Sequence, residues 1–251
     1  MKEQILEKLN EIQEKENITI LFAVETGSRA WGHNNINSDN DISFIYKHND
    51  ISDYLVLDKF EDVIQKEDGV FDFVGWDVKK ALNLHFKSNP NLREWLISPV
   101  VYVPDEIGIF RDLPEFNSEI LKHHYFGLAH KTNKKYIQAS NLRDLKIVKK
   151  TLYVIRCTLA WMALNERIMP QMDMLQLIDD CGIEGDLKEA ILNLRTSYSN
   201  LEIENVSDEQ LELIHTWIGE SFDKFEKKPF KAAKRNIDDY NERFQEIIGL
   251  K

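Results

Sequence analysis

Apolar residues recur at helical spacing near the start of the chain and then form two short continuous runs. Within residues 2–16, charged residues alternate with an apolar stripe, which predicts an amphipathic helix that covers one face of a sheet. The residues of that stripe are Ile5, Leu6, Leu9 and Ile12. Residues 18–24 and 42–46 are apolar and rich in β-branched and aromatic side chains, so each predicts a strand.

The spacing changes along the rest of the chain. Short strands are predicted at 54–57 and 100–103, and helices at 78–87 and through 92–96. Beyond the connection at 104–114 the spacing is almost entirely helical, with helices predicted at 151–169, within 171–194 on either side of a break at 182–186, and at 207–226. The pattern therefore predicts an α/β (α+β) protein with a small mixed-sheet domain at residues 1–110 and an all-α domain at residues 111–251.

Composition narrows the class of protein. The 251 residues carry a formal net charge of −11, which argues against a generally basic surface for nucleic acid or membranes. No apolar run is long enough to span a membrane, and residues 1–4 do not begin a signal peptide. Cys157 and Cys181 lack metal-ligand spacing, so we expect reduced thiols in a cytoplasmic protein.

The most informative stretch lies between the first two predicted strands, at residues 27–41. It begins with the turn Gly27-Ser28-Arg29, whose backbone N–H groups, hydroxyl and guanidinium suit phosphate oxygens. It ends at Asp39 and Asp41, which would share one face of a strand as a carboxylate pair. Two carboxylates this close favour a divalent cation between them. Each half alone is also typical of an ordinary turn, but together they indicate binding of a nucleoside triphosphate with magnesium.

The sequence Gly-Ser-Arg-Ala-aromatic-Gly at residues 27–32, followed by Ser-Asp-x-Asp at 38–41, resembles the polymerase-beta-type nucleotidyltransferase superfamily. It is most similar to the group associated with RNA ligases in predicted RNA-repair operons. Residues 73–82, 89–99 and, more loosely, 149–156 extend the resemblance. At Asn40 relatives often carry an aromatic residue, but its side chain should face away from the carboxylates. The resemblance implies a nucleotidyltransferase domain followed by a helical substrate- and nucleotide-binding domain.

Enzymes of this superfamily use a third carboxylate on a neighbouring strand, and two aspartates are candidates. Asp72 lies inside an apolar run, where a charged residue needs a reason. Asp77 follows a glycine and precedes a helical pattern, so it fits a helix N-cap. We therefore expect Asp39, Asp41 and Asp72 to be the catalytic and metal-binding residues, holding two Mg²⁺ (or Mn²⁺) ions, with Asp77 as the alternative third acid.

The nucleotide-binding set combines the glycine turn with a basic segment. Residues 131–150 hold seven basic residues against one acid, and three lysines within 146–150 share a helical face with Tyr153. That face could close over the triphosphate or the acceptor strand, or be an ordinary solvated surface. With the resemblance taken into account, we expect the following residues to bind nucleotide: Gly27, Ser28, Arg29, Lys149, Lys150 and Arg156. The basic residues of the tail at 225–235 fit a solvated terminus better than a phosphate contact.

The expected activity is Mg-dependent transfer of a nucleoside monophosphate from a triphosphate, with ATP favoured, to an acceptor hydroxyl. The resemblance implies an RNA end as acceptor. Two rivals stay open, namely adenylylation of a protein or small molecule, which the acidic composition favours, and a non-catalytic nucleotide-binding or antitoxin-like module. The oligomeric state does not follow from the sequence.

Overall fold

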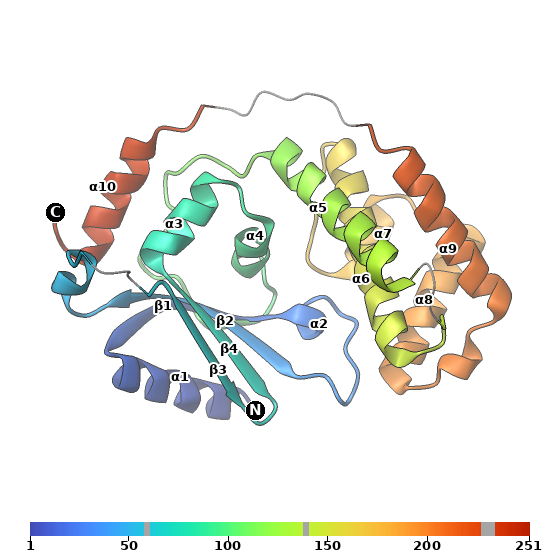
Figure 1. Cartoon of the computed structure of the whole chain (residues 1–251), viewed down its shortest axis with the longest axis horizontal. Helices are drawn as coiled ribbons and strands as arrows, with labels where there is room; N and C mark the ends of the chain where they lie inside the picture. The colour runs from blue at the N-terminus through green and yellow to red at the C-terminus, as the bar shows by residue number, and fades with distance from the viewer. Residues whose placement is uncertain (58–60, 138–140, 227–233) are drawn as a thin grey trace. The chain divides into compact units, whose positions relative to one another are not determined.

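The computed structural model describes residues 1–57, 61–137, 141–226 and 234–251, which form two compact units. The first, here called the sheet unit, comprises residues 1–27, 39–116 and 234–251. The second, the helical unit, comprises residues 28–38 and the described part of 117–233. The predicted class, a mixed sheet combined with a mainly helical part, is confirmed (Figure 1).

The sheet unit is built on five strands in the order β3-β4-β2-β1-β5. They are β1 (Ile18–Thr26), β2 (Asn40–His48), β3 (Val63–Asp68), β4 (Phe71–Asp77) and β5 (Val101–Val103). β2 and β4 are parallel, and the other neighbouring pairs are antiparallel. The parallel pair at the centre brings the beginning of β2 beside the beginning of β4.

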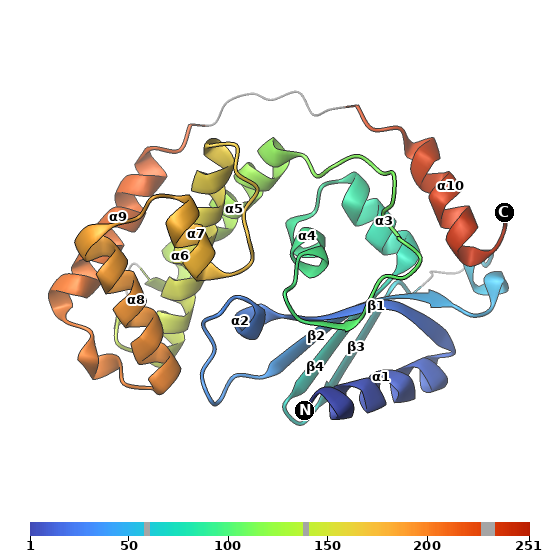
Figure 2. The same ribbon diagram turned by 180° about the vertical axis from the view of Figure 1, so that it is seen from behind.

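Helices cover both faces of this sheet (Figures 1 and 2). On one face, α1 (Lys2–Glu16) packs its buried side chains on Ile42, Phe44 and Phe73. The opposite face is covered by α3 (Val78–Phe86), α4 (Pro90–Leu96) and the C-terminal helix α10 (Ile237–Ile248). Each buried aliphatic or aromatic side chain here contributes about 2 kcal/mol.

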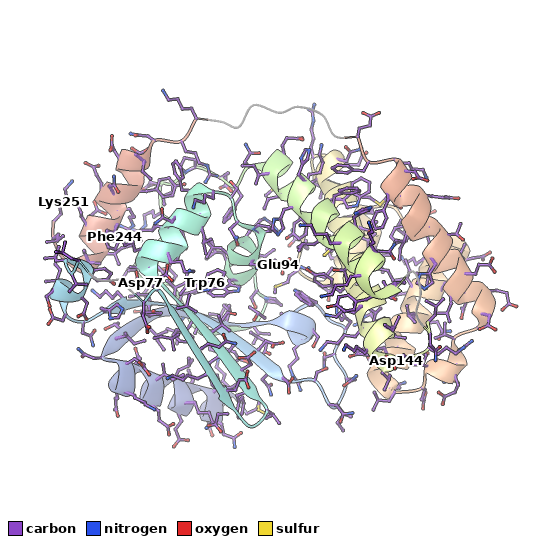
Figure 3. The ribbon with its side chains drawn as sticks, viewed as in Figure 1. Trp76, Asp77, Glu94, Asp144, Phe244 and Lys251 are labelled. Atoms are coloured by element: carbon purple, nitrogen blue, oxygen red, sulfur yellow. The ribbon has the colours of Figure 1, made fainter. Side chains whose placement is uncertain are left out.

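The helical unit contains α5, α6, α7, α8 and α9. Their bounds are Ser118–Thr132, Leu145–Asn165, Met174–Asp180, Gly185–Asn200 and Asp208–Asp223. Helix α6 is buried along most of its length, and it begins where the Asp144 carboxylate accepts from the backbone N–H groups of Lys146 and Ile147 (Figure 3). Helix α5 continues into one π-helical turn, η2 (Asn133–Ile137). Among the described residues, no helix combines the length and apolar character needed to cross a bilayer.

Most predicted elements are confirmed within a few residues, but two regions differ. The strand predicted at 54–57 is wrong, because residues Ile51–Tyr54 form a short 3-10 helix, η1, capped by Asp50. The charged segment that follows forms β3, an edge strand whose polar side chains face solvent. Its hydrophobic pattern is weak because an edge strand needs little apolar surface.

The compact units divide the chain differently from the predicted domains. The division falls after residue 116 rather than 110, and two further segments change sides. Residues 28–38 belong with the helices, and α10 belongs with the sheet because Tyr240 and Ile247 pack into its core. The predicted basic tail is divided too. Lys227, Lys228 and Lys231 lie outside the described residues, whereas Arg235 donates to backbone carbonyls of the sheet unit, including that of His85.

Candidate active site

Strand β1 is followed directly by Gly27, where a side chain would collide with Asp41 on the neighbouring strand β2. Gly27 has a φ of +65°, which side chains of L-residues rarely allow. A Cβ atom at this position would lie 1.9 Å from Oδ2 of Asp41, so the Asp41 carboxylate occupies the space that a side chain would need. The hydroxyl of Thr26 donates to the Asp41 carbonyl over 3.0 Å. The turn therefore holds the beginning of β2 and its carboxylate close to the backbone.

Two carboxylates lie next to each other at this end of the sheet. Asp41 on β2 is the register partner of Asp72 on the parallel strand β4, and register partners point to the same face. The strands are about 4.8 Å apart, so the two side chains leave the same face of the sheet at neighbouring positions. Oδ1 of Asp72 is buried and has no hydrogen-bond partner. We call Asp41 and Asp72 the aspartate pair.

Asp39, which was predicted to form a carboxylate pair with Asp41, is placed differently. It is exposed and precedes the first residue of β2. Within the described ranges, no three His, Cys, Asp or Glu side chains gather closely enough to hold a metal ion. The aspartate pair nevertheless suits a hard divalent cation, because it offers carboxylate oxygens and one of them is buried without a partner.

A buried glutamate supports the aspartate pair, and the sequence analysis missed it. Glu25 is 3% exposed, and its Oε1 accepts from the Asp41 backbone N–H over 3.1 Å. Its other oxygen accepts from the hydroxyl of Tyr102 on β5. The sequence does carry a signal for Glu25, because it is a charged residue in the apolar run of β1. As with Asp72, burial of a charge at such a position needs a reason.

The alternative acid, Asp77, has a structural role. It lies at the start of α3, and its Oδ1 accepts from the backbone N–H of Lys79 over 2.7 Å, which confirms the predicted N-cap (Figure 3). Its Oδ2 accepts from the Tyr54 hydroxyl over 2.7 Å. Burial raises the pKa of Asp77 to about 6, although both hydrogen bonds oppose this. Asp77 is completely buried and lies five residues along β4 from Asp72.

The rest of the glycine turn belongs to the helical unit. Ser28 and Arg29 form the single helical turn α2 (Gly27–Ala30), and the units divide immediately after Gly27. Ser28 is buried, and its carbonyl accepts from the His33 N–H over 3.0 Å. Arg29 donates through Nη2 to the Ser38 carbonyl over 2.8 Å. We call residues 28–38 the Trp31 loop; these hydrogen bonds close it on itself.

Aromatic and cationic side chains anchor the Trp31 loop to the helices. The Arg156 guanidinium lies 4.8 Å from the centre of the Trp31 ring, and its Nε donates to the Met172 carbonyl over 3.1 Å. Arg156 is only 1% exposed. Arg195 on α8 donates to the Gly32 carbonyl. The predicted nucleotide ligand Arg156 is thus an interior cation of the helical unit that holds the loop bearing Ser28.

His33 is the unusual residue of this loop. It is 1% exposed and its ring is tilted by 34° to that of Trp31 at a centroid distance of 5.5 Å, yet neither ring nitrogen has a hydrogen-bond partner. Burial, and then the charges of Arg156, Arg195 and Lys149, lower the pKa of His33 to about 3. The imidazole is therefore neutral at physiological pH, in surroundings that favour negative charge.

The predicted lysines lie on α6. Lys149 is exposed and close enough to contribute to the positive potential at His33. Lys150 is half-buried, with its Nζ 5.4 Å from the centre of the Tyr136 ring. Of the predicted nucleotide-binding set, Gly27 is thus in the sheet unit, and Ser28, Arg29, Lys149, Lys150 and Arg156 are in the helical unit.

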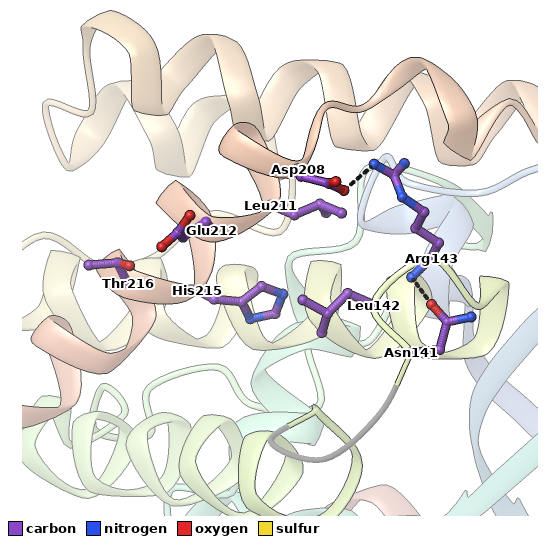
Figure 4. A pocket seen from close by; sticks show the side chains of 8 residues that line it. All are labelled: Asn141, Leu142, Arg143, Asp208, Leu211, Glu212, His215 and Thr216. Carbon is purple, nitrogen blue, oxygen red and sulfur yellow. Dashed lines mark hydrogen bonds and ion pairs between the residues drawn. The ribbon is translucent and has the colours of Figure 1, made fainter.

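A separate cavity of about 410 Å³ lies in the helical unit between α9 and the segment that precedes α6 (Figure 4). Leu142 and Leu211 line it, together with His215, whose buried Nε2 has no partner. Arg143 at its edge pairs with Asp208 over 2.5 Å and donates to the carbonyls of Ile203 and Val206. None of the predicted site residues lines this cavity.

Comparisons with known proteins show the family of this chain. A curated relative, the uncharacterized protein YcgL of Bacillus subtilis, is 31% identical over 250 residues, covering 94% of this chain and 92% of its own. A solved structure, a nucleotidyltransferase-like protein from Exiguobacterium sibiricum, aligns with 99% of this chain and 87% of its own at 9% identity and a TM-score of 0.32. The model of the RNA repair pathway DNA polymerase beta family matches residues 1–246. The chain therefore belongs to the RNA repair pathway DNA polymerase beta family.

Proposed function

We propose that this protein transfers a nucleoside monophosphate from a nucleoside triphosphate, with ATP favoured, to a hydroxyl at an RNA end. One observation carries the proposal. The aspartate pair places two carboxylates on the same face of adjacent strands, with Oδ1 of Asp72 buried and without a partner. Like charges opposite each other in a sheet are destabilising, so an arrangement of this kind is expected where a bound cation compensates for it.

The residues of the sheet unit have distinct roles in this proposal. Asp41 and Asp72 would hold Mg²⁺ or Mn²⁺, with Asp39, which the structure does not gather with them, as a further ligand, and Asp72 would also accept the proton of the acceptor hydroxyl. Bound metal ions would supply charge neutralisation at the phosphates and a lower pKa for the attacking hydroxyl. Gly27 leaves room for the Asp41 carboxylate, and Glu25 fixes the backbone that carries it. Catalysis then rests on positioning and charge compensation.

The residues of the helical unit supply donors for phosphate. In the proposal Ser28, Arg29 and Lys149 bind the triphosphate. Arg156 acts as a positioning residue, because its contacts with Trp31 and Met172 hold the Trp31 loop. The assignment to an RNA repair family supports an RNA acceptor. The formal net charge of −11 favours the rival in which a protein or small molecule accepts the nucleotide.

The test is pyrophosphate release and label transfer with each of the four α-labelled nucleoside triphosphates. The purified protein is incubated with Mg²⁺ and, in separate reactions, with an RNA oligonucleotide, with no added acceptor, and with small-molecule cell extract. We expect Mg-dependent labelling of the RNA. Labelling of the protein itself or of an extract component would support the rival acceptors, and absence of pyrophosphate release in every reaction would contradict an enzymatic role.

Three variants connect the activity to the site. Asp41→Asn and Asp72→Asn should each lower transfer about 100-fold or more, because each variant removes one of the two carboxylate charges of the aspartate pair. The matched control is Asp68→Asn, which removes an exposed carboxylate at the end of β3 that pairs with Lys8. It should retain full activity. Equal activity in Asp72→Asn and Asp68→Asn would exclude Asp72 from catalysis.

A further inference from the structure

A group of lysines surrounds one tyrosine where the π-helical turn η2 packs on α6. Nζ of Lys135 lies 4.8 Å from the centre of the Tyr136 ring, and Nζ of Lys150 lies 5.4 Å from it. Interaction with the Lys135 ammonium, together with the charges of Lys150 and Lys146, lowers the pKa of the phenol. We call Lys135, Lys146 and Lys150 the lysine cluster.

The fold holds the lysine cluster in place. The turn η2 ends at Ile137, which is 3% exposed, so the turn is anchored in the core while Lys135 faces solvent. Lys146 and Lys150 are four residues apart on α6 and therefore share a face. Lys134 on η2, Lys149 on α6 and Lys131 at the end of α5 are exposed as well.

The lysine cluster has no internal counter-charge. Within the part of the chain that the structure describes, none of its three lysines forms an ion pair with a carboxylate. The only acid in residues 131–150, Asp144, has its Oδ1 engaged as the N-cap of α6. The arginine of this region, Arg143, is paired with Asp208. Mutual repulsion of such lysines is unfavourable unless an anion compensates for it.

We propose that the lysine cluster binds the phosphate backbone of the RNA acceptor. This inference rests on the proposed function, in which an RNA end accepts the nucleotide. Exposed ammonium groups spread over two segments match the repeated charges of a polynucleotide. A triphosphate-binding site would instead require convergent donors around one ligand. In an otherwise acidic chain, the lysine cluster limits RNA contact to one face of the helical unit.

The test measures RNA binding separately from catalysis. Fluorescence anisotropy of a labelled single-stranded RNA is recorded in EDTA, without nucleotide, between about 50 and 200 mM NaCl. The triple variant Lys135→Gln/Lys146→Gln/Lys150→Gln should bind about 100-fold more weakly at 0.1 M salt, with a salt slope smaller by about 2, because three phosphate contacts are lost. Affinity for a fluorescent ATP analogue with Mg²⁺ should fall much less than affinity for RNA, because only Lys150 of the three is also an expected nucleotide ligand.

Two controls make the result specific. Lys2→Gln/Lys87→Gln/Lys224→Gln removes the same charge from exposed lysines elsewhere and should bind RNA like the wild type. The variant Lys135→Arg/Lys146→Arg/Lys150→Arg keeps the positive charge of the lysine cluster and should retain RNA binding. The proposal is overturned if the wild type does not bind RNA, if both triple glutamine variants lose affinity equally, or if the cluster variant loses the ATP analogue instead. Because binding in EDTA needs no turnover, these outcomes are independent of whether pyrophosphate is released.

Discussion

The two units of this protein each contain buried polar atoms without a partner, but in fields of opposite sign. In the sheet unit, this atom is Oδ1 of Asp72, whose register partner on the adjacent strand is another aspartate, Asp41. In the helical unit, both nitrogens of His33 lie in the positive field of Arg156, Arg195 and Lys149. One environment suits a cation and the other suits an anion.

This difference shows how binding chemistry is divided within one chain. The sheet unit fixes its carboxylates through strand register and through the buried Glu25. The helical unit surrounds the Trp31 loop with cations that donate to loop carbonyls or stack on its aromatic ring. Both arrangements reduce stability unless the missing charge is supplied, so ligand and folding are expected to be coupled. Three predictions test the contrast.

The largest expected effect is selective acid unfolding of the helical unit. The folded pKa of His33 is about 3, below the unfolded value of about 6.5, so the unfolded chain binds a proton that the folded chain does not. Stability is therefore lost as pH falls from 6.5 towards 3, by about 3 kcal/mol at pH 4.5. Burial lowers the pKa of His215 as well, so both histidines act in the same direction.

The sheet unit contains a group, Asp77, that offsets part of the loss of stability in acid. His85, with a pKa of about 4, also disfavours acid, but Asp77, with a pKa raised to about 6, gains stability as pH falls from 6 towards 4. Peptide-resolved hydrogen exchange at pH 7 and 4.5 should show α6 losing protection before α3. His33→Phe should remove most of the difference. Equal acid sensitivity of this variant and the wild type would mean that His33 does not control acid unfolding.

The next effect, of up to similar size, is expected at the two glycines that face carboxylates, one in each unit. Gly27→Ala should cost about 3 kcal/mol, because it combines a left-handed φ with a contact to Asp41. Gly32→Ala, where a Cβ would lie 2.6 Å from Asp173, should cost about 2 kcal/mol. Urea denaturation gives both values. Only Gly27→Ala should also abolish transfer, since only it displaces an aspartate of the pair; equal residual activity would contradict the site.

The smallest effect compares two aspartates of one strand. Asp72→Asn removes repulsion with Asp41 and should raise stability by up to about 1 kcal/mol. Asp77→Ala removes a helix cap and the acceptor of the Tyr54 hydroxyl, and should lower stability by about 2 kcal/mol. Thermal melts of both variants in EDTA provide the measurement. A higher melting temperature for Asp77→Ala, or a lower one for Asp72→Asn, would contradict the roles assigned to these two aspartates.

Much of the fold was predictable because burial leaves a periodic pattern. The apolar stripe of α1 and the continuous runs of β1 and β2 are direct consequences of packing against one core. β3 was not predicted, because an edge strand carries few apolar residues. The placement of α10 could not be predicted either, since its amphipathic pattern shows that it packs but not which unit it packs on.

The candidate site was predictable where sequence spacing decides the geometry. Alternation along a strand places Asn40 on the face opposite Asp41, and its side chain indeed contacts the Val70 carbonyl over 3.4 Å. The partnership of Asp41 with Asp72 depends on register between strands that are distant in sequence, and spacing alone could only suggest it. The burial of Arg156 beneath Trp31 depends on tertiary packing, so the motif indicated a basic residue but not its interior position.

The chain passes between the two units four times, after residues 27, 38, 116 and 233. No single cut can therefore separate them into intact halves: a fragment ending at residue 116 would lack α10 and would carry a Trp31 loop without its anchoring arginines. A gene fusion or recombination event would therefore have to carry the whole coding sequence for both units to stay intact. Expression of isolated domains is accordingly a poor route to studying either half.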